Sequence, residues 1–154
     1  MKIPRFLLAI ALCLLAANLI AEDTGFPLHM VSGQVVAPIP GQMAIAAYIS
    51  LENRSGETVT LAGASTEAAG HASLHRTESV DGMNRMQSVE SIVIEEGELL
   101  EMKAGGLHLM LMEPDFQMLS SDSIELSIEL LDGRTQTFQL PLVSIRDMPN
   151  HSSH

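Results

Sequence analysis

The spacing of turn-forming residues constrains the fold of this chain most strongly, because it leaves no room for a long amphipathic helix. Clusters of such residues occur at 38–41, 52–56, 81–82, 104–106 and 132–133. The segments between them are short and mostly β-compatible: residues 28–36, 43–51, 58–64, 71–78, 91–94, 99–102, 107–112, 123–131 and 135–142. Short strands at regular spacing predict an all-β sandwich of one domain.

The segment 107–112, LHLMLM, alternates strictly. Successive side chains of a strand point to opposite faces, so His108, Met110 and Met112 are expected to share one face. His108 and Met110 then lie about 6.6–7 Å apart along the backbone. Two flexible side chains at that separation can reach one metal ion.

A second strand pair is predicted around residues 81–82, an Asp-Gly dipeptide that favours a two-residue hairpin loop. With that loop, Thr77 lies opposite Met86 in the hairpin. His75 is two residues from Thr77 and therefore lies diagonal to Met86 on the same face. The prediction depends on loop length, since a slip of one residue would move Met86 to the other face.

Four donors in these segments form a candidate metal site: His75, Met86, His108 and Met110. Ten residues separate the first two, twenty-one separate Met86 from His108, and one lies between His108 and Met110. Imidazole and thioether donors without a thiolate or an essential carboxylate suit Cu(I) better than zinc, iron or calcium. Methionine more often fills gaps in a core, and we expect that use for Met102, Met112 and Met118.

The first 21 residues have the pattern of a secretory signal peptide. A basic start is followed by an apolar run at 6–17, which is too short for a comfortable membrane span, and a small residue, Ala21, precedes the acidic mature start. Cys13 lies within the apolar run, and the bulky Leu12 before it disfavours lipoprotein processing. We therefore expect an exported protein without a membrane anchor, with its domain at 22–145 and a polar tail at 146–154.

Composition excludes several classes of function. Removing the leader moves the formal charge from −11 to −13, which argues against a nucleic-acid partner. It also removes the only cysteine, so that no disulfide, thiolate site or blue-copper centre is expected. The chain contains no catalytic-triad, phosphate-loop or HExxH pattern, which favours a binding protein over an enzyme. We expect a monomer.

Three further histidines are candidate auxiliary donors. His71 shares the predicted strand face of His75, either as a surface residue or as an additional donor. His151 and His154 lie in the tail, where imidazoles could capture Cu(II) at a second site. The alternative for the tail is an incidental polar end.

The spacing of the four donors resembles that of the periplasmic copper chaperones called PCuAC. The resemblance covers about residues 31–143. It includes Pro40-Gly41 before the AAY of 46–48, a turn at Asn53, Asp81-Gly82-Met83 before Arg85-Met86, the run at 104–111, and Asp132-Gly133 before the last strand.

This resemblance implies a cupredoxin-like β-sandwich with Greek-key topology that binds Cu(I) in the periplasm. His75, Met86, His108 and Met110 match the family's ligands. Such proteins pass copper to cytochrome c oxidase assembly, to an oxidase subunit or alongside a Sco-type protein. The alternative is a periplasmic copper-buffering or resistance protein without a dedicated oxidase recipient.

Overall fold

The computed structural model describes residues 25–147, and nearly all of its regular structure is β-strand. A single 3-10 turn, η1 (Met118–Ser120), precedes β9. The strands are β1 (Leu28–Val36), β2 (Ala44–Asn53), β3 (Val59–Ser65), β4 (Ala69–Val80), β5 (Met83–Val89), β6 (Ile92–Ile94), β7 (Leu99–Glu101), β8 (Leu107–Pro114), β9 (Ser123–Leu130) and β10 (Thr135–Val143).

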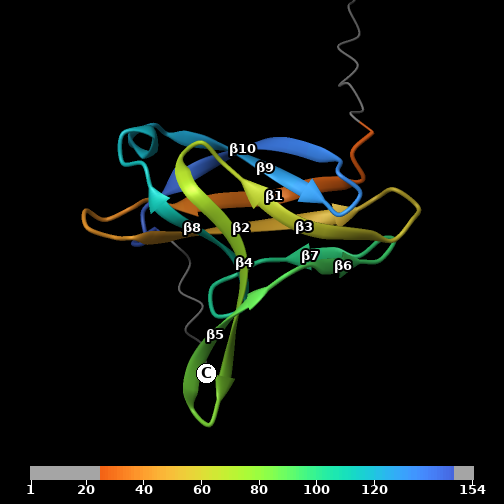
Figure 1. Ribbon diagram of the computed structural model, residues 1–154, viewed down its shortest axis with the longest axis horizontal. Coiled ribbons are helices and arrows are strands. Elements are labelled where there is room, and N and C mark those ends of the chain that lie inside the picture. The colour runs from red at the N-terminus through yellow and green to blue at the C-terminus, as the bar shows by residue number, and fades with distance from the viewer. Residues whose placement is uncertain (1–24, 148–154) are drawn as a thin grey trace, which may run out of the picture.

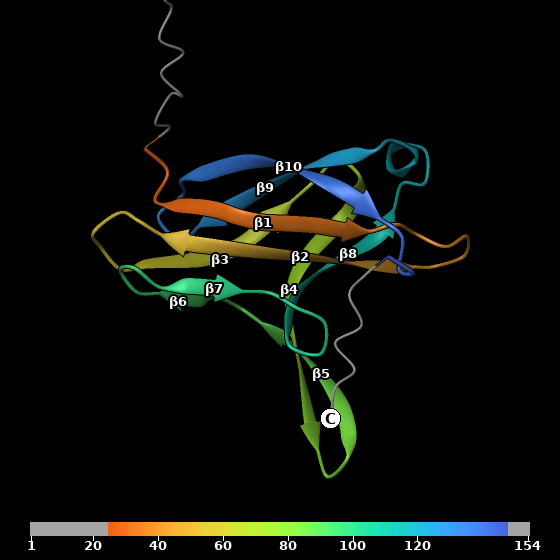
Figure 2. The same cartoon turned by 180° about the vertical axis from the view of Figure 1, so that it is seen from behind.

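The strands form two layers, which Figures 1 and 2 show from opposite sides. One layer has the order β5-β4-β8-β2-β1, with β7 also paired to β2, and the other has the order β10-β9-β3-β6. The end of β10 pairs in parallel with β1 and so joins the layers. Because β8 lies between β2 and β4 and pairs with both, the order is not that of a simple meander. The predicted all-β sandwich is confirmed.

The core lies between the layers and is built from alternate residues of the long strands. Burial alternates along all ten residues of β2, as expected for a strand with one face in the core. In β8 the buried series is Leu107, Leu109 and Leu111, which turns the other series toward the outside of the layer. The outer face of β8 therefore carries the candidate donors, while the leucines anchor the strand.

The hairpin of β4 and β5 projects from the sandwich body (Figure 1). Its loop is the predicted two-residue turn, with Asp81 and Gly82 at positive φ angles of 53° and 75°. Both central residues of a type I′ turn need such angles, which Gly adopts freely and Asp tolerates. Thr77 is the register partner of Met86, so the predicted pairing is confirmed.

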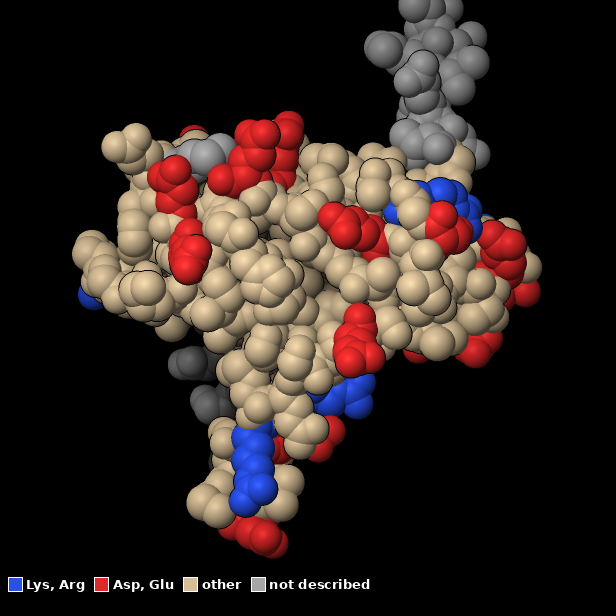
Figure 3. Space-filling view, viewed as in Figure 1, with Lys and Arg blue, Asp and Glu red and all other residues tan. Residues whose placement is uncertain are grey.

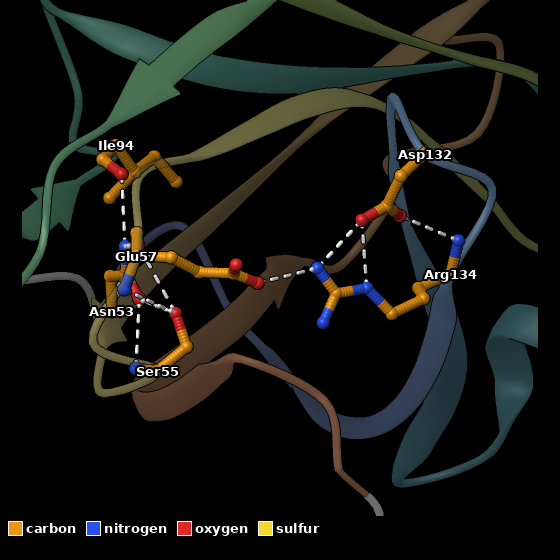
Figure 4. Close-up of polar contacts among 6 residues, drawn as sticks. All are labelled: Asn53, Ser55, Glu57, Ile94, Asp132 and Arg134. Carbon is orange, nitrogen blue, oxygen red and sulfur yellow. Dashed lines mark hydrogen bonds and ion pairs between the residues drawn. The ribbon is translucent and has the colours of Figure 1, made fainter.

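The end of β2 is fixed by Asn53, whose side chain is fully buried. Its amide nitrogen donates to the carbonyl oxygens of Glu57 and Ile94 at 2.7 and 3.0 Å, and its oxygen accepts from the backbone N–H and hydroxyl of Ser55 (Figure 4). The turn predicted at 52–56 is thus held to β6 of the other layer. All the hydrogen-bonding groups of this buried amide are paired.

A surface ion-pair cluster lies near that turn. Arg134 pairs with Asp132 at 2.6 Å and with Glu57 at 3.2 Å (Figure 4). Hydrogen bonds from Arg134 hold the pKa of Asp132 below its ordinary value. Because this carboxyl group is exposed, solvent weakens its contribution to stability.

Several predictions concern residues outside the described range. The signal peptide at 1–21, Cys13, and the tail histidines His151 and His154 all lie there. Within residues 25–147, no helix is long and apolar enough to span a lipid bilayer.

Candidate metal centre

The pairing of β4 with β8 brings the two predicted histidine donors together. His75 is the direct register partner of His108. The two rings are stacked, with centroids 6.0 Å apart and an interplanar angle of 29°. Two residues 33 positions apart in the sequence are thus neighbours on one sheet face. The sequence predicted that each would lie near a methionine but gave no direct pairing between them.

Met110 and Met86 lie on the same face, on either side of the histidine pair. Met110 is two residues beyond His108 on β8 and is the register partner of Ser73. Met86 is on β5 opposite Thr77, and is therefore diagonal to His75. The pleat and register place all four predicted donors on the outer face of one layer, within three adjacent strands.

His108 is held in one tautomer by the backbone just before its strand. Its Nδ1 lies 3.0 Å from the carbonyl oxygen of Gly106. A carbonyl oxygen can only accept, so Nδ1 carries the proton and Nε2 keeps a lone pair. A hydrogen bond from the second ring nitrogen to a backbone carbonyl is the usual way in which a metal-binding histidine is oriented.

His75 has an unpaired buried nitrogen. Its Nε2 lies 3.0 Å from the hydroxyl oxygen of Ser73, whereas its Nδ1 is buried and has no hydrogen-bond partner. Leaving a buried polar atom unpaired costs about 1–3 kcal/mol. Such atoms are rare in folded proteins and call for an explanation, of which an ion is one. When Nε2 donates to Ser73, the lone pair of the ring is on this unpaired Nδ1.

The electrostatic environment favours the neutral form of His75. Burial, followed by the charges of His108 and His71, holds the pKa of His75 below its ordinary value. A lower pKa leaves the imidazole uncharged at neutral pH, which is the form that binds a metal. Protons therefore compete less with a cation for this ring.

The donors differ in exposure. His108 is 5% exposed and Met110 is half-buried, whereas Met86, on the projecting hairpin, is 51% exposed. The ring of Tyr48 on β2 lies 6.4 Å from that of His108 and borders the histidine pair on its β2 side. The site is thus closed toward β2 and open toward the hairpin.

The surroundings contain little that would suit a hard cation. No group of three or more His, Cys, Asp or Glu side chains in residues 25–147 is arranged to hold a metal. Figure 3 shows Asp and Glu scattered over the sandwich body, and both basic and acidic side chains on the projecting hairpin. Two imidazoles and two thioethers remain, which is a donor set suited to a soft monovalent ion.

Other methionines and histidines fall into different environments. Met102 is buried, as predicted. Met112 is not a core residue, contrary to expectation: it is half-buried on the donor face, opposite the exposed His71. The leucine series of β8 already fills the core, which leaves Met112 on the outside. The side chain of Met118 lies outside the described part of the structure.

Sequence reasoning did not identify Ser73, the carbonyl of Gly106 or Tyr48 as part of this site. Only strand register brings them to the histidines, and no local motif signals that register across β4 and β8. Alternation from His75 did place Ser73 on the donor face, which was the one available sign.

Comparisons with known proteins agree with this architecture. The apo PCuAC domain of PmoF2 superposes with a TM-score of 0.65 at 14% identity, over 80% of this chain and 94% of that domain. The solution structure of Cu(I)-DR1885 from Deinococcus radiodurans gives a TM-score of 0.60 at 26% identity, over 81% of this chain and 84% of that one. The fold is the predicted cupredoxin-like β-sandwich.

A sequence relative, "Putative lipoprotein Lxx21020" from Leifsonia xyli subsp. xyli, is 29% identical over 103 residues. The match covers 66% of this chain and spans 62% of the length of that relative. The model of the LpqE-like family, described as "Putative lipoprotein LpqE-like", matches residues 28–142, which include every strand of the sandwich except the last residue of β10. The chain therefore belongs to the LpqE-like family.

Proposed function

We propose that this protein is an exported copper carrier that binds Cu(I) through His75, Met86, His108 and Met110. The observation that carries the proposal is the stacked histidine pair with the unpaired Nδ1 of His75, flanked on the same face by two thioethers. The likeness to a solved Cu(I)-DR1885 structure at 26% identity supports it. Copper is the cargo of the site rather than a cofactor for a reaction.

The donor types suit binding followed by transfer. Thioether and imidazole ligands hold Cu(I) and can be replaced one at a time by the ligands of an acceptor. The graded exposure gives this exchange an order: half-exposed Met86 leaves first, and buried His108 leaves last. The ion then passes between proteins without being released as free copper.

The setting of this function is the periplasm. The signal-peptide pattern of residues 1–21 and the lipoprotein descriptions of the relatives support export. We propose an acceptor in cytochrome c oxidase assembly, either an oxidase subunit or a Sco-type protein. The tail histidines His151 and His154 stay a predicted site for Cu(II), and Cys13 stays a predicted unmodified residue of the leader.

The ligand assignment is tested by Cu(I) competition against a chromophoric chelator under reducing conditions. In the variant Met86→Leu/Met110→Leu, both sulfurs are lost and the apolar volume is kept. We expect a fall in affinity of at least about 100-fold, since even loss of an outer partner typically costs 10–100-fold. An unchanged affinity would refute the assignment.

A matched control uses two methionines that lie outside the donor cluster. Met83, on the same hairpin, and Met43, which precedes β2, are 57% and 71% exposed. The variant Met43→Leu/Met83→Leu removes the same number of sulfurs, and we expect it to bind Cu(I) as the wild type does. A loss in this variant equal to that in the test variant would show that any exposed thioether serves.

Delivery and buffering are distinguished in the source organism. Deletion of the gene lowers cytochrome c oxidase activity if the protein delivers copper, and added copper restores that activity. Copper sensitivity with normal oxidase activity would instead identify a buffering or resistance protein.

A further inference from the structure

The outer face of β4 and β8 continues its series of donors beyond the four predicted ligands. Moving along β8 from His108, the next two residues on this face are Met110 and Met112. His71 on β4 is the direct register partner of Met112, as His75 is of His108. A second histidine thus faces a thioether on the same two strands.

We propose that His71 and Met112 form a second, weaker site for a soft monovalent cation, with Met110 shared between the two sites. This inference rests on the proposed function, since its cargo is the same ion. Directly opposed residues of an antiparallel pair have Cβ atoms about 4.5–5.5 Å apart, so both side chains can reach one ion. Two or three soft donors suit Cu(I).

The neighbouring positions leave room for this site. The register partners of Met112 and Met110 on β2 are Ala44 and Ala46, whose small side chains do not cover the thioethers. His71 is exposed and Met112 is half-buried, so that solvent and a solvated ion can reach both. By contrast, the histidine pair is bordered on its β2 side by the ring of Tyr48.

The separation of the two sites suits transfer between them. His108 and Met112 are four residues apart on one strand, which corresponds to about 13 Å, and Met110 is about 6.6–7 Å from each. His71 and His75 lie on the same face of β4, on either side of Ser73, so the two pairs are neighbours. An ion bound at the more open pair can therefore reach the histidine pair through Met110.

The test is a titration of the full-length, signal-processed protein with Ag(I), a redox-inert substitute for Cu(I), followed by NMR of 13C-methyl-labelled methionines. We expect the first equivalent to shift the methyl resonances of Met86 and Met110. The second equivalent, bound at least about tenfold more weakly, is expected to shift Met112. A second equivalent that shifts Met148 in the tail and leaves Met112 unchanged would overturn the inference.

The variant His71→Ala/Met112→Leu provides the second test. It is expected to bind one equivalent of Ag(I) instead of two, counted by titration, and to keep the first equivalent, followed at the methyl groups of Met86 and Met110, with unchanged affinity. The variant His29→Ala/Met43→Leu, which changes one exposed histidine and one exposed methionine elsewhere, is the control and is expected to keep both. If the test variant keeps the second equivalent, the second site is refuted.

The outcomes separate the two proposals. If Ag(I) shifts the methyl resonance of Met112 in the wild-type protein but not those of Met86 and Met110, the proposed function is refuted and a site at His71 and Met112 remains. A first equivalent at Met86 and Met110 with no response of Met112 would refute only the further inference. Absence of any methionine response would refute both.

Discussion

Asn53 and the histidine pair are polar side chains in the same layer of strands, but they differ in whether their buried polar atoms have hydrogen-bond partners. The amide of Asn53 is fully buried and makes four side-chain hydrogen bonds. The imidazole of His75 keeps a buried Nδ1 without a partner, next to the 5% exposed ring of His108. All the hydrogen-bonding groups of the Asn53 amide are paired within the fold, whereas one ring nitrogen of His75 is not.

This difference separates a structural role from a binding role. A buried polar group with all its bonds made contributes to the fold, and its removal leaves partners unpaired. A buried nitrogen with an open lone pair costs folding free energy in the absence of a ligand, because its lost hydration is not replaced. The contrast predicts that stability and affinity for copper can be changed separately, by substitutions at different ends of the sandwich.

The largest effect is expected from His108→Leu. The substitution keeps an apolar side chain in a buried position, and the carbonyl of Gly106 still accepts the backbone N–H of Thr77. We expect Cu(I) affinity to fall by more than about 100-fold, while the free energy of unfolding of the apo protein changes by less than about 1.5 kcal/mol. Chelator competition and urea denaturation measure the two quantities. A large loss of stability with intact affinity would reverse the comparison.

The converse substitution is Asn53→Ala. It leaves the buried carbonyl of Ile94 without the partner that the structure gives it and removes the turn contacts to Ser55. We expect the free energy of unfolding to fall by about 3 kcal/mol, measured by urea denaturation, and Cu(I) affinity to stay unchanged. Asn84→Ala, at an exposed position of the hairpin, is the control and should leave both quantities near wild type.

A smaller effect is expected from Ser73→Ala, which removes the hydroxyl beside Nε2 of His75. The ring then loses its orienting contact but keeps the lone pair of its unprotonated nitrogen. We expect Cu(I) affinity to fall by about tenfold, as for other outer partners of metal ligands, with little change in stability. Ser88→Ala removes the exposed serine opposite His75 on β5. If the two variants bind equally well, the hydrogen bond between Ser73 and Nε2 of His75 has no part in binding.

The smallest effect is expected from Asp132→Asn in the exposed ion-pair cluster. Its partner Arg134 lowers the pKa of Asp132, so the carboxylate stabilises the fold above its unfolded pKa of about 3.9. That contribution is lost as the pH falls through the lower pKa of the folded state. We expect a stability loss at pH 7 well below that of Asn53→Ala, and none once the native carboxyl is protonated. Thermal melts at pH 7 and at a pH below the folded-state pKa of Asp132 measure this loss of stability. A loss that is the same at both pH values would contradict the ion-pair explanation.

The sequence predicted the parts of this molecule that depend on neighbouring residues. Asp81 and Gly82 specify a two-residue turn, and this turn fixes the register of Thr77 with Met86. Alternation in 107–112 likewise predicted which side chains of β8 share a face. In both cases the information lies within a few residues of the structure that it determines.

The pairing of strands that are distant in the sequence could not be predicted from local sequence patterns. Nothing near His75 or His108 specifies that β4 pairs with β8 rather than with another strand of similar composition, because that choice depends on packing of the whole core. The same limit applies to Asn53, which was predicted as a turn residue although its amide bonds to Ile94, 41 positions away. Met112 was misplaced because the leucines of β8 take the core positions.

The projecting hairpin divides the donors between two parts of unequal local stability. β8 is flanked on both sides by β2 and β4, whereas six of the seven residues of β5 are exposed and that strand ends the layer. Segments with few buried contacts open at low free energy while the rest of a domain stays folded. The residence time of a bound ion should then follow the opening rate of the hairpin, so that a change at the remote Asp81-Gly82 turn could set how long copper stays.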